Sequence, residues 1–152
     1  MKDQVVLRVV CKITIPFILL FGLYVITHGE LGPGGGFQGG VIVAASFILY
    51  CLIFGKKQGS RVLPERVTEC LAGFGVLLYA GTGITTMFLQ GRFLDYEVLW
   101  RRGIIPETGG GLGEVIGVTL VEYGVGITVA SVMIIIFNMI TEPDEDSVQS
   151  EV

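Results

Sequence analysis

The fold is decided by residues 115–140, which read VIGVTLVEYGVGITVASVMIIIFNMI and contain one charged side chain, Glu122. An apolar run of this length can cross the hydrocarbon core of a bilayer as a helix. Three further apolar runs are predicted to cross as well, and they cover residues of about 5–26, 37–54 and 71–89. The sequence therefore predicts an all-α integral membrane protein, with four transmembrane helices, that passes several times through the cell membrane.

Composition also indicates a lipid environment. Of the 152 residues, 51% are hydrophobic and only 16% are charged, and the mean hydropathy is +0.73. One small soluble core could not bury that much apolar side chain. We expect a single transmembrane domain over residues 1–141, followed by an acidic, disordered tail over residues 142–152. Little chain remains for a soluble catalytic unit, so an enzyme in its own right is not expected.

The distribution of basic residues predicts the orientation. Four spans place both termini on one side of the membrane, and the side richer in Lys and Arg is normally cytoplasmic. Seven of the ten basic residues lie in the amino-terminal flank and the second loop: Lys2, Arg8, Lys12, Lys56, Lys57, Arg61 and Arg66. We therefore predict that both termini are cytoplasmic. On the opposite side, the third loop carries Phe93, Tyr96, Leu99 and Trp100 at helix-like spacing, which predicts an interfacial segment.

The densest motif lies between the first two spans and consists of Pro33, Gly34, Gly35, Gly36, Phe37, Gln38, Gly39 and Gly40. Gly34, Gly36 and Gly39 match a dinucleotide-binding pattern, but that pattern follows a strand, whereas a membrane span precedes it here. Close helix packing is the default interpretation, because Gly35 with Gly39, and Gly36 with Gly40, repeat at four-residue spacing. A compatible third interpretation places flexible backbone at membrane depth, beside protein or a hydrated cavity.

Glu122 is the main candidate for an ion path. It lies seven residues inside the fourth span, about 10 Å along the helix axis. A carboxyl group at that depth costs on the order of 2 to 3 kcal/mol, so it must face protein or water, and it commonly marks an ion route. The alternative is a protonated Glu that only joins two helices. Thr119 and Gly126 share its helix face, and Tyr123 is adjacent.

Weaker candidates lie on the other spans. Thr82, Thr85 and Thr86 could line a path, although Thr in a membrane helix more often bonds a carbonyl of its own backbone. His28 could relay protons, but a His at a membrane boundary is more often simply solvated. The three cysteines have no metal-ligand spacing, so we expect no metal site. We also expect no cofactor and no nucleic-acid partner.

The glycine motif resembles the signature of the MnhB/MrpB family. The resemblance continues through Gly81, Thr82 and Gly83 and through residues 122–126, which read EYGVG. Members of this family are B subunits of Mrp-type antiporters, and related subunits occur in membrane-bound hydrogenases and ferredoxin-linked complexes. Glu30 and Gly32 replace a His and a hydroxyl residue that antiporter members commonly have, and Glu122 stands where Asp is frequent.

The resemblance implies a subunit that helps to form or wall a cation/proton path. Its partners would be Na⁺, H⁺, the lipid bilayer and other membrane subunits of an antiporter-like complex. Two alternatives stay open at this point. One is a B-like component of a redox-driven hydrogenase or ferredoxin-linked respiratory complex, and the other is a purely structural assembly subunit whose glycines only pack against neighbouring subunits.

Overall fold

The computed structural model describes residues 5–29, 34–89, 91–96, 98 and 112–141. Four long helices run over these residues, and a short helix, α3, connects the second and third of them. Their bounds are α1 Val5–Thr27, α2 Gly36–Phe54, α3 Lys56–Val62, α4 Glu65–Phe88 and α6 Leu112–Thr141. All four long helices are long and apolar enough to cross a membrane. The predicted all-helical fold with four candidate spans is therefore confirmed.

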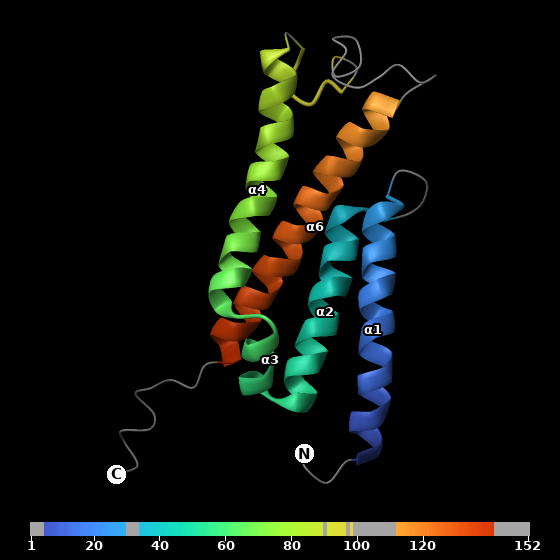
Figure 1. Cartoon of the computed structure of the whole chain (residues 1–152), viewed down its shortest axis with the longest axis vertical. Coiled ribbons are helices and arrows are strands. Elements are labelled where there is room, and N and C mark those ends of the chain that lie inside the picture. Colours follow the sequence, from blue (N-terminus) through green and yellow to red (C-terminus); the bar gives the residue numbers. More distant parts are fainter. Residues whose placement is uncertain (1–4, 30–33, 90, 97, 99–111, 142–152) are drawn as a thin grey trace, which may run out of the picture.

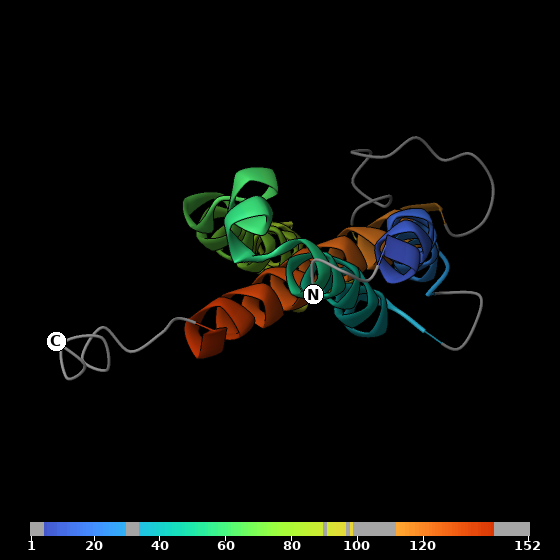
Figure 2. The ribbon, with the colours of Figure 1, turned by 90° about the horizontal axis from the view of Figure 1, so that it is seen from below.

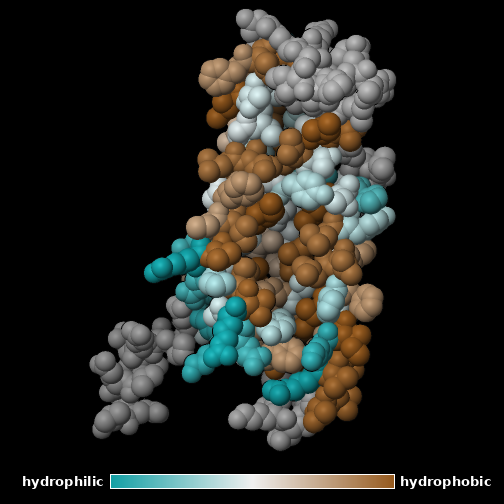
Figure 3. All heavy atoms as spheres, in the orientation of Figure 1, coloured by the Kyte–Doolittle hydropathy of each residue, from teal (hydrophilic) through white to brown (hydrophobic). Residues whose placement is uncertain are grey.

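The long helices form an open row (Figures 1 and 2). Helix α6 packs against α4 on one side and against α2 on the other, and α1 packs mainly on α2. This order leaves α1 and α4 at the two ends of the row. Large apolar side chains consequently stay uncovered along the helices, for example Phe17 on α1 at 66% exposure and Leu77 on α4 at 71%. Figure 3 shows the resulting hydrophobic surface, which suits lipid or neighbouring membrane subunits.

The structure differs from the hydropathy prediction at the start of α4 and at the short helix α3. Helix α4 begins at Glu65, before the predicted start at Leu71, because Pro64 sets the entry to a helix whose first turns are charged and therefore do not register as apolar. Helix α3 was not predicted. Gly55 separates it from α2 with a φ of 96°, a conformation that glycine adopts without strain.

The described part of the third loop folds back onto the helices. Residues 91–96 form turns, whereas Leu99 and Trp100 lie outside the described residues. Phe93 packs on Gly83 of α4, and Tyr96 packs on Gly117 of α6. Burial raises the pKa of the Tyr96 phenol above its usual value, with a smaller contribution from Tyr79. The phenol therefore stays neutral at physiological pH. The acidic tail over residues 142–152 is also outside the described residues.

We expect Thr86→Val to loosen this loop. The Thr86 side chain is fully buried, and its hydroxyl donates to the Gly83 carbonyl at 2.8 Å while accepting the Leu94 N–H at 3.0 Å. Leaving that N–H without its acceptor costs about 1 to 3 kcal/mol. Thr85→Val is the matched control, because exposed Thr85 bonds only the Gly81 carbonyl of its own helix. Faster proteolysis in the third loop of the Thr86 variant alone is the expected result, and equal cleavage of the two variants would contradict it.

Candidate functional site

The glycine-rich turn and Glu122 meet where α6 passes the end of α1 and the start of α2. A Cβ placed on Gly29 would collide with the Glu122 carboxylate, and one placed on Gly35 would lie 3.3 Å from Glu122 Oε1. A Cβ on Gly36 would collide with the Glu122 backbone carbonyl. The half-buried carboxyl group therefore lies against bare backbone that only glycine can supply.

The start of α2 provides a polar environment for this carboxyl group. Gly36 is the first residue of α2, and no side chain caps the helix. The first N–H groups of a helix have no partner within it and carry partial positive charge. Gly35 precedes them with a φ of 152°, which side chains rarely allow. A negative charge on Glu122 is thus placed at the favourable end of the α2 dipole.

Close glycine contacts hold α2 in this position. A Cβ on Gly40 would lie 2.6 Å from the Gly126 carbonyl of α6, whereas one on Gly39 would lie 2.8 Å from the Gly22 carbonyl of α1. The motif thus serves two interfaces: Gly36 and Gly40 face α6, and Gly39 faces α1. The pair of Gly35 and Gly39 does not form one packing face, because Gly35 precedes the helix and lies beside Glu122.

Helix α6 is approached equally closely from its other side. A Cβ on Gly75 of α4 would lie 2.6 Å from the Gly124 carbonyl. Gly126, two residues further along α6, faces Ile26 of α1 and the Gly36 carbonyl of α2 instead. The EYGVG segment therefore packs against α4, α2 and the end of α1. Gly22, Gly29 and Gly75 were missed by the sequence analysis, although the short distance from Gly29 to the glycine motif was a usable signal.

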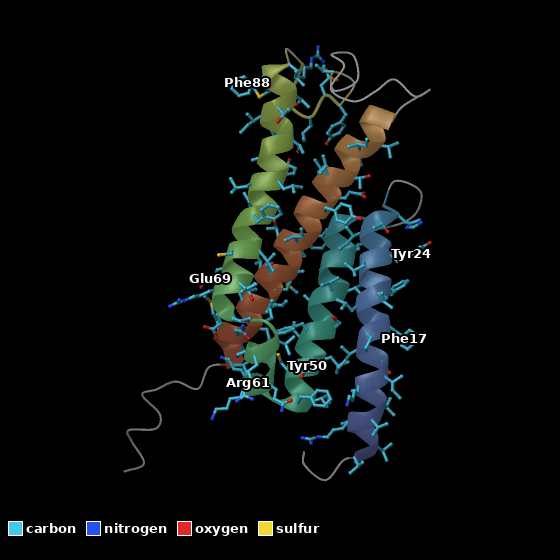
Figure 4. The ribbon with its side chains drawn as sticks, in the orientation of Figure 1. Phe17, Tyr24, Tyr50, Arg61, Glu69 and Phe88 are labelled. Carbon is cyan, nitrogen blue, oxygen red and sulfur yellow. The ribbon has the colours of Figure 1, made fainter. Side chains whose placement is uncertain are left out.

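The other predicted residues lie around this centre or away from it. Thr119 and Tyr123 are half-buried on α6 near Glu122. His28 immediately precedes Gly29, but its ring is exposed and stacks on Tyr24 with ring centres 4.1 Å apart. The backbone of His28 therefore lies close to Glu122, whereas the imidazole ring of His28 packs on Tyr24 of α1. Figure 4 shows Tyr24 near that end of α1.

Thr82 and Thr85 lie on α4, which borders α6 on the face opposite to α2. Their hydroxyls donate to the carbonyls of Tyr79 and Gly81, both at 2.7 Å, as the sequence favoured. The structure does not group them with Glu122.

The remaining residues of the motif are accessible or lie outside the described residues. Phe37 is 64% exposed, and Gln38 is exposed next to it. Pro33 lies outside the described residues, as do Glu30 and Gly32. Among the described residues, no group of His, Cys, Asp and Glu could hold a metal ion through three side chains.

Comparison with known proteins identifies the family. A family model described as a domain related to the MnhB subunit of Na⁺/H⁺ antiporter matches residues 6–135. Proteins named "Putative antiporter subunit mnhB2" from Staphylococcus aureus strains Newman and JH1 are 35% identical over 134 residues, which are 88% of this chain and 91% of each relative. The matched range includes the glycine-rich turn, Glu122 and most of all four spans. The chain therefore belongs to the MnhB family of Na⁺/H⁺ antiporter subunits.

Proposed function

We propose that Glu122 and the glycine-rich turn form part of the wall of a cation/proton path in a multi-subunit Na⁺/H⁺ antiporter. Membership of the MnhB family makes the chain a membrane transport subunit rather than a catalytic enzyme. The observation that supports the path is the contact of the Glu122 carboxylate with Gly29 and Gly35. The glycine-rich turn and the acid Glu122, the two features of the sequence least typical of a membrane span, thus meet in one place.

The chemistry of this arrangement suits ion exchange. A carboxylate can bind a proton or offer oxygen ligands to Na⁺, and an acid inside a span usually marks an ion route. Uncovered backbone at the end of a helix supplies further polar groups at membrane depth. In transporters, helix starts of this kind point at anionic groups near the transported ion. Gly29 and Gly35 leave room for the carboxyl group beside the turn, and Gly36 leaves room for the backbone of Glu122.

The open row of helices supports a role within a larger complex. Both α1 and α4 end the row and expose large apolar side chains, such as Phe17 and Leu77. The related proteins are named antiporter subunits, so other membrane subunits of such a complex are the proposed partners. That naming favours Na⁺/H⁺ exchange over a redox-driven complex. The contact of Gly36 with the Glu122 carbonyl also suits a purely structural role. The Glu122→Gln variant distinguishes the two roles, because only a role in the path requires a titratable group.

We also propose that the end carrying α3 is cytoplasmic. The first turn of α1, the last turn of α6 and α3 lie at the same end of the row (Figure 1). Hydrophilic side chains gather at this end in Figure 3. Helix α3, which lies there, carries the exposed Lys57 and Arg61. Basic residues beside spans favour the cytoplasmic side.

Labelling from one side of the membrane tests the orientation. In a Cys70→Ser background, which leaves the buried Cys11 and Cys51, Ser60→Cys is expected to react with an impermeant maleimide only in inside-out vesicles. Arg92→Cys, at the opposite end of the helices, is the control and should react only in right-side-out vesicles. Reaction of the Ser60 variant in right-side-out vesicles would overturn the proposed orientation.

A further inference from the structure

A second polar cluster lies between α4 and α6 at the end that carries α3. A pocket of about 110 Å³ is lined there by Glu65, Glu69, Ile135, Asn138 and Met139. Figure 4 shows Glu69 of α4 and Arg61 of α3 toward this end of the helices. Asn138 lies sixteen residues beyond Glu122 on α6, about 24 Å along the axis at 1.5 Å per residue. The pocket is therefore separate from the Glu122 site.

Asn138 is the feature that points to a ligand. Asn138 is only 8% exposed, and its backbone carbonyl accepts a hydrogen bond from Lys56 Nζ at 3.1 Å. Its side-chain amide, however, makes no hydrogen bond to any residue over the described part of the chain. Asn138 lines the pocket, so its unpaired amide is accessible there although the residue as a whole is nine-tenths buried. An unpaired amide that faces a pocket shared with two carboxylates indicates a polar ligand.

The surroundings restrict which groups face that ligand. Thr68 lies between the two glutamates on α4 and is fully buried. Its hydroxyl donates to the Pro64 carbonyl of its own chain at 3.2 Å. Since residues three and four apart share a helix face, Glu65 and Glu69 flank the buried position from adjacent turns. The polar side-chain groups left to line the pocket are therefore two carboxylates and one amide.

We infer that this pocket binds a monovalent alkali cation, Na⁺ in the transporting complex, where it enters or leaves on the α3 side. Carboxylate and amide oxygens are the ligands that hard cations prefer, and water completes their coordination. The formal charges of Glu65, Glu69 and nearby Lys56 sum to one negative charge, which matches a monovalent ion better than a divalent one. A cavity of about 110 Å³ has room for a cation that keeps some of its water. The inference rests on the proposed Na⁺/H⁺ exchange.

Transport kinetics of the whole complex in vesicles test this assignment. Glu69→Gln and Asn138→Leu are expected to raise the half-saturating Na⁺ concentration 5-fold to 10-fold while the maximal rate changes less than 2-fold. Asp95→Asn, at the opposite end of the helices, is the matched control and should change neither quantity. Unchanged half-saturation in a Glu69→Gln complex that still transports would overturn the cation site and leave the proposed function standing. Asn138→Leu could fail to assemble because Asn138 is buried. Glu69 is exposed, so the Glu69→Gln complex is expected to assemble and still decides the test.

Direct binding distinguishes this inference from the proposed function. Purified complex is titrated with ²²Na⁺, and Glu122→Gln is included as a variant that blocks transport but leaves the pocket intact. Weaker binding to Glu69→Gln than to Glu122→Gln supports the site, even where the transport assay itself fails. Equal binding to both variants, or displacement of ²²Na⁺ from the Glu69-dependent site by micromolar Ca²⁺ or Mg²⁺, contradicts a monovalent cation site.

Discussion

Replacing Glu122 with Gln is expected to reduce Na⁺-dependent proton movement to the background level while the complex remains assembled. Glutamine keeps the size and hydrogen-bonding capacity of the side chain but can neither release a proton nor carry a negative charge. The carboxylate contacts at Gly29 and Gly35 leave space for the amide. The measurement is proton and Na⁺ movement in vesicles over a range of pH, with native gels to verify assembly.

Glu122→Asp is the matched variant for this experiment. Aspartate keeps the titratable group but shortens the side chain by one methylene, so part of the activity should remain. Transport at wild-type rates by the Glu122→Gln complex would show that this carboxyl group only joins α6 to the turn before α2. In that case the proposed path fails, and the purely structural interpretation stands.

The second large effect is expected from Gly36→Leu, which should abolish or strongly reduce assembled complex. A side chain at this position collides with the Glu122 backbone carbonyl, and backbone cannot move aside as a flexible side chain can. Overpacking of this kind commonly costs about 1 to 3 kcal/mol, and more where the backbone must shift. Helix α2 would be displaced from α6, and the turn would be displaced from the carboxylate. The measurement is the amount of intact complex on native gels relative to the amount of expressed chain.

Gly73→Leu is the matched control, because a Cβ at Gly73 of α4 meets nothing within 4 Å. It introduces the same side chain into a membrane helix without the collision. Gly39→Leu should resemble Gly36→Leu, since Gly39 packs on the backbone of α1. Intact complex at wild-type amounts with both the Gly36 and the Gly39 variants would contradict the packing role of the motif.

Phe37→Ala provides a contrast within the same motif. Phe37 is 64% exposed, so its truncation opens no cavity in this chain and should be mild for assembly. We expect a larger effect on transport than on assembly, because the ring lies beside the glycine-rich turn. Loss of assembly equal to that of Gly36→Leu would instead show that Phe37 is mainly a contact to a partner subunit.

The sequence by itself determined the membrane class and the four candidate spans, and it singled out Glu122 as the acid inside a span. These conclusions depend on local quantities, namely the length of each apolar run and the cost of an acid within one of them. The start of α4 at Glu65 and the short helix α3 were not predicted, because charged helical turns at a membrane boundary do not differ from a loop in hydropathy.

Only the tertiary structure decided the order of the row and the partner of each glycine. Glycine spacing shows that a helix can be approached closely, but a residue without a side chain does not specify which neighbour approaches it. Gly36 and Gly39 therefore looked alike in sequence, although one contacts α6 and the other α1. The meeting of Gly29 with Glu122, and of Asn138 with Glu69, likewise depends on how helices distant in sequence are aligned. In lipid that alignment is set by close packing rather than by hydrophobic pattern.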